Sequence, residues 1–224
     1  MARDTFQRVL EQLQDEVLLL GSRVEQAILD AVGALSRRDM IAARTIYEYD
    51  EAINEKRFAI ENAVLIQIAT QQPMAHDLRC LVAILEIVNE LERMGDYAKG
   101  ITKVIFILKE EDIFIPDKDF NRMAELGVEM LHDGLQAFLH SDAQAARKIA
   151  EKDDAVDDLY NQVYHKLVAA MIADPEIIDP TNYLMWVAHN LERLADRVVN
   201  ICERTIFAAT GELFELDTEE EMGV

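Results

Sequence analysis

The strongest constraint on the fold of this chain is that it carries the same sequence patterns twice. Residues 91–96 read L-E-R-M-G-D and residues 191–196 read L-E-R-L-A-D, with four of six positions identical. A second pattern, D-x-x-A-A-R-x-I-x-x-x-D, begins at Asp39 and recurs at Asp142. The two patterns keep their order, and their offsets differ by only three residues. We therefore expect two halves with one common fold, produced by duplication within the chain.

Helical periodicity runs through both halves. Between residues 9 and 35, apolar side chains recur every three or four positions and trace one helix face. Only 8 glycines and 4 prolines occur, and prolines stand where the periodicity breaks. The sequence predicts an all-α chain with six long helices, near residues 4–36, 40–70, 75–108, 119–139, 142–173 and 179–210. We expect two tandem, pseudo-symmetric antiparallel three-helix bundles, in residues 1–110 and 117–210, and an acidic, flexible tail in residues 211–224.

Charge restricts the partners of the chain. It holds 43 acidic and 22 basic residues, a formal net charge of −21. A body this acidic repels a phosphate backbone, which argues against nucleic acid as a direct partner. No secretory signal is visible, and no apolar run approaches the roughly 18 residues of a membrane span. Together with two isolated cysteines, Cys80 and Cys202, this predicts a cytoplasmic protein with free thiols.

Pairs of acidic side chains stand four residues apart in both halves. Side chains at that spacing share one helix face and repel each other, so two copies call for an explanation. A second oxygen-rich pair lies on the preceding helix of each half, where antiparallel packing would bring the two faces together. The predicted metal ligands are Asp50, Asn54, Glu92 and Asp96 in the first half, and Asp153, Asp157, Glu192 and Asp196 in the second. Oxygen ligands suit magnesium, calcium, manganese or iron, and zinc less well.

Other readings of these residues stay open. The acidic faces could be solvated, or paired with Arg93 and Arg193. Glu129 and His132 form one E-x-x-H motif, which di-iron bundles carry twice; the equivalent positions in the first half are Gln26 and Leu29. Nucleophile motifs and glycine-rich phosphate loops are missing, so the sequence does not predict an enzyme.

Beyond these patterns, the chain resembles the PhoU family. The resemblance rests on L-E-R-M-G-D-Y-A at residues 91–98, on D-E-A-I-N and D-D-A-V-D at residues 50–54 and 153–157, and on the Q-P-M-A-H-D-L-R stretch at residues 72–79. It covers essentially residues 4–210. The second copy departs from the family pattern, because Ala195 replaces Gly95 and Arg197-Val198 replace Tyr97-Ala98.

The resemblance implies a non-enzymatic negative regulator of phosphate uptake and phosphate signalling. Such proteins link the ATPase subunit of the phosphate transporter to a sensor histidine kinase, are commonly homodimers, and meet the membrane through protein partners. The resemblance also implies a multinuclear metal cluster, with iron expected and manganese, magnesium, calcium, zinc or nickel as alternatives. A carboxylate-bridged storage or redox bundle and a metal-free helical scaffold are the competing hypotheses.

Overall fold

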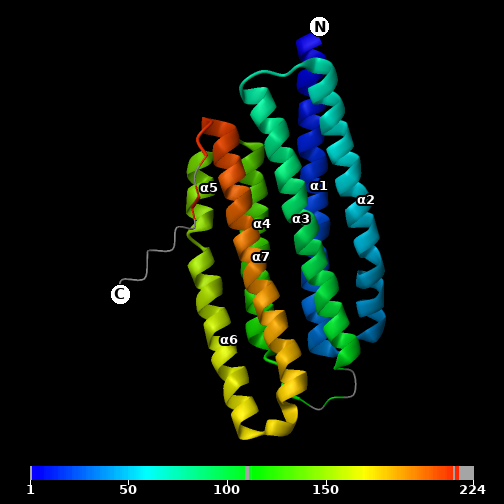
Figure 1. The fold of residues 1–224 in the computed structure, drawn as a ribbon, viewed down its shortest axis with the longest axis vertical. Coiled ribbons are helices and arrows are strands. Elements are labelled where there is room, and N and C mark those ends of the chain that lie inside the picture. Colours follow the sequence, from blue (N-terminus) through cyan, green and yellow to red (C-terminus); the bar gives the residue numbers. More distant parts are fainter. Residues whose placement is uncertain (1, 109–110, 112, 214, 217–224) are drawn as a thin grey trace.

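The fold is built only from helices in the part of the chain that the structure describes (Figure 1). This computed structural model describes residues 2–108, 111, 113–213, 215 and 216. The first half contains α1 (Ala2–Arg37), α2 (Met40–Gln71) and α3 (His76–Ile107). The second half contains α4 (Asp117–Leu139), α5 (Ala143–Ala150), α6 (Asp153–Ala173), a short 3₁₀ turn (Pro175–Ile177) and α7 (Ile178–Thr210). The predicted all-α class and the two sets of three helices are confirmed, with the predicted fifth helix divided into α5 and α6.

The turn between the first two helices of each half is duplicated in detail. Asp39 caps α2 by accepting hydrogen bonds from two backbone N–H groups, each at 3.0 Å. Asp142 caps α5 in the same way, at 3.0 and 2.9 Å. The residue before each cap has a left-handed backbone, with φ of 53° at Arg38 and 52° at Ser141. The same aspartate cap after the same backbone reversal supports the predicted duplication.

The second half departs from the first where the predicted fifth helix is divided into α5 and α6. The α2 helix runs without interruption, but α5 ends at Ala150 and α6 begins at Asp153. At the division, Lys152 N–H donates to Ile149 and Lys152 C=O accepts from Ala155, both three residues away. These hydrogen bonds between residues three apart replace the four-residue α-helical pattern and change the direction of the chain at the start of α6.

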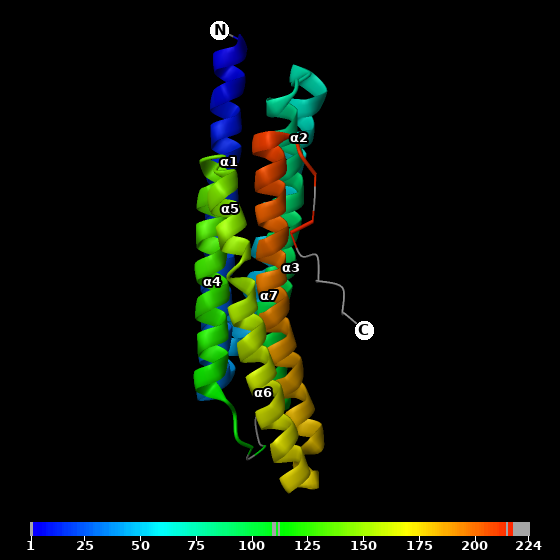
Figure 2. The same ribbon diagram turned by 90° about the vertical axis from the view of Figure 1, so that its left-hand side faces the viewer.

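Helices α3 and α7 run antiparallel and join the two halves (Figure 2). Glu86 pairs with Arg204 at 3.0 Å, and further along Glu90 pairs with Arg197 at 3.2 Å. At the other end of this contact, a Cβ on Gly100 would overlap the Trp186 ring. Gly100 therefore serves close helix packing.

Helices α1 and α4 make a second contact between the halves. The buried apolar side chains form one continuous cluster with contributions from α1 to α7. The halves therefore share a single core instead of folding around two separate ones.

Candidate functional site

The first predicted ligand set lies between α2 and α3. Asp50 is 4% exposed, although an aspartate is normally found at the surface. Its Oδ2 accepts a hydrogen bond from Asn54 Nδ2 at 3.1 Å. Asn54 therefore turns its amide nitrogen, and not its amide oxygen, toward Asp50. The Oδ1 atom of Asp50 is buried and has no hydrogen-bond partner in the described part of the chain. Asp50 therefore has one oxygen bound by protein groups and one oxygen without such a bond.

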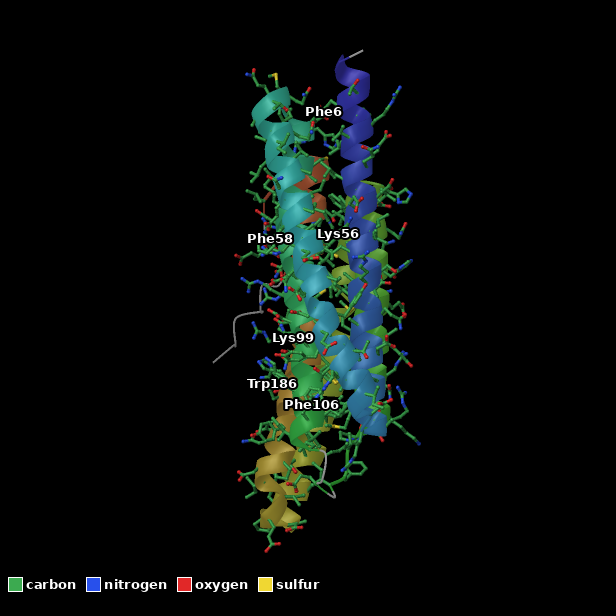
Figure 3. All side chains as sticks on the ribbon, turned by 90° about the vertical axis from the view of Figure 1, so that its right-hand side faces the viewer. Phe6, Lys56, Phe58, Lys99, Phe106 and Trp186 are labelled. Atoms are coloured by element: carbon green, nitrogen blue, oxygen red, sulfur yellow. The ribbon has the colours of Figure 1, made fainter. Side chains whose placement is uncertain are left out.

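The charge of Asp50 is balanced by Lys99, a residue that the sequence prediction missed. Lys99 Nζ donates to Asp50 Oδ2 at 2.6 Å, and it also lies 5.2 Å from the centre of the Tyr47 ring. Figure 3 shows Lys99 on α3, on the same face of the molecule as Trp186. The hydrogen bond with Asp50 is the main cause that raises the pKa of the Lys99 ammonium. A signal was available, because Lys99 stands three residues after Asp96 and so on the same side of α3.

The carboxylates of α2 and α3 influence one another, as the predicted convergence requires. Burial is the largest cause that raises the pKa of the Glu92 carboxyl, and the charges of Asp96 and Asp50 raise it further. Two guanidinium groups, those of Arg57 and Arg93, act in the opposite direction. The first set is therefore an acidic cluster under mutual repulsion, and basic side chains compensate part of its charge.

The second predicted ligand set has a different environment. Asp153 is 8% exposed and stands at the first residue of α6. Asp153 and Asp157 line a cavity of about 380 Å³ between α5, α6 and α7, whereas Glu192 and Asp196 do not line it. Glu192 Oε2 lies 3.2 Å from His189 Nδ1 on the same helix. The position equivalent to Lys99 is Val199, so this half lacks the lysine that balances the first set.

The donor atoms of the first set suit a hard cation, but their arrangement in space does not. Carboxylate oxygens are suitable metal ligands, and the buried Asp50 Oδ1 accepts no hydrogen bond from the described residues. Within the described residues, however, no group of three or more histidine, cysteine, aspartate or glutamate side chains is arranged to hold a metal ion. The Lys99 ammonium supplies the positive charge beside Asp50 that a cation would otherwise supply. The ligands are therefore present but are not assembled in this conformation.

The rival E-x-x-H motif does not form a centre of its own. Glu129 Oε1 pairs with Lys152 Nζ at 2.9 Å. His132 Nδ1 lies 3.5 Å from Glu25 Oε1, which is on α1. The two side chains therefore engage different partners.

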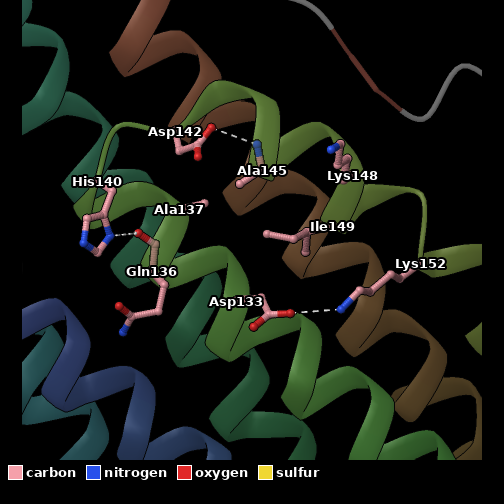
Figure 4. A pocket seen from close by; sticks show the side chains of 9 residues that line it. All are labelled: Asp133, Gln136, Ala137, His140, Asp142, Ala145, Lys148, Ile149 and Lys152. Atoms are coloured by element: carbon pink, nitrogen blue, oxygen red, sulfur yellow. Dashed lines mark hydrogen bonds and ion pairs between the residues drawn. The ribbon is translucent and has the colours of Figure 1, made fainter.

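Figure 4 shows another cavity, of about 390 Å³, between α4 and α5. Most of its polar side chains are already engaged. Asp133 binds Lys152 at 2.9 Å, Asp142 caps α5, and His140 Nδ1 lies 2.8 Å from the Gln136 carbonyl. The cavity therefore offers few free polar groups to a ligand.

Comparison with known proteins gives one consistent result. The family model described as PhoU domain matches residues 17–105 and 120–205, one match in each half. A protein of Clostridium acetobutylicum named phosphate-specific transport system accessory protein PhoU homolog is 35% identical, over 97% of this chain and all of that protein. A homolog of the same name from Caulobacter vibrioides is 38% identical, over 91% of this chain and 89% of that protein.

Solved structures agree in fold as well as in sequence. The crystal structure of the phosphate transport system regulatory protein PhoU from Streptococcus pneumoniae superposes with a TM-score of 0.86. It is 34% identical, with 93% of this chain and 99% of that chain covered. PhoU from Pseudomonas aeruginosa gives a TM-score of 0.87 at 31% identity, with 92% of this chain and all of that chain covered.

Proposed function

Because the chain belongs to the PhoU family, we propose that it is an accessory protein of phosphate transport that restrains phosphate-starvation signalling when phosphate is plentiful. The observation that carries this proposal is the match across both halves and nearly the whole chain to phosphate-specific transport system accessory proteins. The family is one of accessory and regulatory proteins, which favours a binding role over an enzymatic one.

The proposed partners are the ATPase subunit of the phosphate transporter and a sensor histidine kinase. None of the helices in the described part of the chain is long and apolar enough to cross a membrane. We place the protein in the cytoplasm as a homodimer that reaches the membrane through these partners. The net charge of −21 supports recruitment by protein contacts, because anionic lipid would repel so acidic a body.

Deletion of the gene tests the regulatory role. In high phosphate, the deletion strain should express a phosphate-starvation phosphatase reporter, and the intact gene supplied in trans should restore repression. Unchanged repression in the deletion strain would remove the proposal. Pull-down of the transporter ATPase and of the kinase by the full chain then tests the two partners separately.

Metal binding is a second proposal, supported by the free oxygen of the buried Asp50 and by the raised pKa of Glu92. The first set would bind a cation, with iron expected, only if Lys99 Nζ moves away from Asp50 Oδ2. In the second set, Asp153 and Asp157 line an open cavity and have no equivalent lysine.

Metal analysis of protein purified without chelators or nickel resin tests this proposal. The double substitution Asp153→Asn with Asp157→Asn should lower the metal content, and Lys99→Met should raise it by removing the competing ammonium. Equal metal content in all three proteins would contradict the proposed sites, and absence of metal from the unaltered protein would favour the scaffold. Oxygen consumption with ferrous iron distinguishes a redox or storage bundle, because only that hypothesis predicts turnover.

A further inference from the structure

One long stretch of this highly charged chain carries no charge. Residues 62–75 contain no aspartate, glutamate, lysine, arginine or histidine, and no other stretch of this length in the chain is free of all five. The stretch forms the last turns of α2 and the turn that leads into α3. Because 29% of the residues in the chain are charged, so long an interruption calls for a physical reason.

Large apolar side chains are exposed in and beside this uncharged stretch. We call five of them, between 37% and 79% exposed, the α2 face: Phe58, Leu65, Ile66, Met74 and Leu78. Phe58 and Leu65 stand seven residues apart and so lie on one side of α2. Met74 and Leu78 continue the face across the turn to the start of α3, the helix that packs against α2. Contiguous apolar surface of this kind marks an interaction site more often than scattered exposed residues do.

The bundle holds one member of the α2 face in place. Figure 3 shows Phe58 on the side of α2 away from α1, whereas Lys56 points toward α1 and pairs there with Glu16. The Arg57 guanidinium lies 4.1 Å from the centre of the Phe58 ring. The same guanidinium donates to Asn89 Oδ1 on α3 at 2.9 Å. Phe58 therefore packs against a fixed group, and a partner would meet a surface that is already formed.

The equivalent turn of the second half provides an internal comparison. Ile172, near the end of α6, is 77% exposed, close to the 79% of Met74. That turn carries three acidic residues, Asp174, Glu176 and Asp179. An exposed apolar side chain is therefore common to both turns, whereas the loss of charge is confined to the turn between α2 and α3.

The size of the α2 face suits a protein interface. At about 150–200 Å² for each large apolar side chain, the five exposed fractions amount to roughly 400–550 Å² of accessible surface. A standard interface buries about 800 Å² on each partner, and about 65% of the surface between identical chains is apolar. The α2 face can therefore supply the apolar part of one such interface.

Electrostatics favours a second copy of this chain as the partner. Each copy has a formal net charge of −21, and a two-fold axis brings the residues of the contact close to their own counterparts. An acidic residue within such a contact would lie near another acidic residue, so self-association requires an uncharged surface. A different protein would instead gain from basic residues placed opposite the acidic body. The α2 face meets the requirement for self-association and offers no charge to a complementary partner.

We propose that the α2 face is the interface of a homodimer, in which the last turns of α2 pack against the same segment of a second copy about a two-fold axis. This inference rests on the homodimer in the proposed function and adds the surface that forms it. Salt should tighten the association, because the Debye length falls from roughly 30 Å at 0.01 M salt to about 10 Å at 0.1 M. The repulsion between the two acidic copies is then screened.

Sedimentation equilibrium of the full chain tests the interface. Leu65→Glu places an acidic residue on both sides of the contact and should raise the dissociation constant of the dimer by at least about tenfold. The matched control Ile172→Glu adds the same charge at the equivalent turn and should leave the dissociation constant unchanged. Both side chains are exposed, so both variants should keep the melting temperature of the unaltered protein.

Cross-linking gives a readout that does not depend on an added charge. Asn62→Cys places a thiol on the exposed side of α2, and Asn161→Cys places one at an exposed position of α6. The native thiols give little background because both are buried, and burial raises the pKa of Cys80 to about 11 and that of Cys202 to about 12. A short bis-maleimide should join two Asn62→Cys chains and should not join two Asn161→Cys chains.

The possible failures can be told apart. A dimer that Leu65→Glu weakens no more than Ile172→Glu does would overturn the α2 face as the interface and leave the homodimer standing. An unaltered protein that stays monomeric at every concentration and salt would overturn both. A monomer that captures the transporter ATPase, and loses it only in Leu65→Glu, would show that the α2 face serves a different protein and would also overturn the inference. The deletion strain tests the phosphate function separately from all of these.

Discussion

Removal of the Lys99 ammonium is the sharpest test of the electrostatic account of the first ligand set. Lys99→Met keeps the length of the side chain but deletes the partner that donates to Asp50 Oδ2 at 2.6 Å. Breaking a buried ion pair by removing one member costs about 3–5 kcal/mol. Here the cost should be smaller, about 1–3 kcal/mol, because Lys99 remains partly in contact with water and Asn54 still donates to the same oxygen.

A double-mutant cycle in urea measures this coupling. Lys99→Met alone should lower the melting temperature by about 2–12 °C, because 1 kcal/mol shifts a chain of this size by roughly 2–4 °C. Asp50→Asn removes the buried charge, so Lys99→Met should cost much less in that background. If the two single costs simply add in the double variant, Asp50 and Lys99 are not coupled and the reasoning fails.

The pH dependence of the same variant gives a second check. The hydrogen bond with Asp50 raises the pKa of Lys99, so the folded state holds this proton more tightly than the unfolded state does. The stability that Lys99 contributes is therefore complete below the ordinary lysine pKa of about 10.4. It is lost as the pH rises through the raised value. The difference between the unaltered protein and Lys99→Met should be constant near neutral pH and should shrink in strong alkali.

Two further substitutions, each with a matched control, test other parts of the structure. Glu92→Gln should raise the melting temperature by about 1–2 °C at neutral pH, because the raised pKa means that the charged form is disfavoured in the folded state. The gain should vanish below the ordinary glutamate pKa of about 4.3, and Glu51→Gln on the exposed face of α2 should give no such gain. Gly100→Ala should lower stability by up to about 2 kcal/mol and shift the fluorescence of Trp186, the only tryptophan, because the new Cβ overlaps its ring. Gly33→Ala meets only the flexible end of an arginine and should be stabilising by about 0.5–1 kcal/mol; equal effects of the two glycine substitutions would contradict the packing account.

The helices could be predicted because their signals are local. Asp39 and Asp142 mark the starts of helices, and prolines mark the breaks between them. The apolar periodicity can be recognised without knowing which helix packs against it. The division between α5 and α6 carries no such signal, since neither Glu151 nor Lys152 is a helix breaker. There Lys152 binds Glu129 and Asp133 on α4, a tertiary contact that local patterns do not contain.

The candidate site was predictable only in part. The repeat identified Asp50 and Glu92, and the structure makes their charges interact. The repeat did not identify Lys99, because the comparison of the two halves considered shared acidic residues, and this lysine is present in one half only. Nor did it indicate that Leu216 would attach to Glu203, since a tail rich in acidic residues reads as a free end. In both cases the missing information is a contact between residues far apart in the sequence.

The antiparallel contact of α3 with α7 has a consequence for how such a protein can arise and change. Two identical three-helix chains that paired through this helix would form a symmetric dimer with the same architecture. Linking the copies makes their association intramolecular, with an effective concentration on the order of millimolar for a short linker and no dependence on expression level. A symmetric dimer must also carry every substitution on both sides. The linked chain is free of that restriction, and it holds Lys99 beside the acidic residues of one half and Val199 in the other.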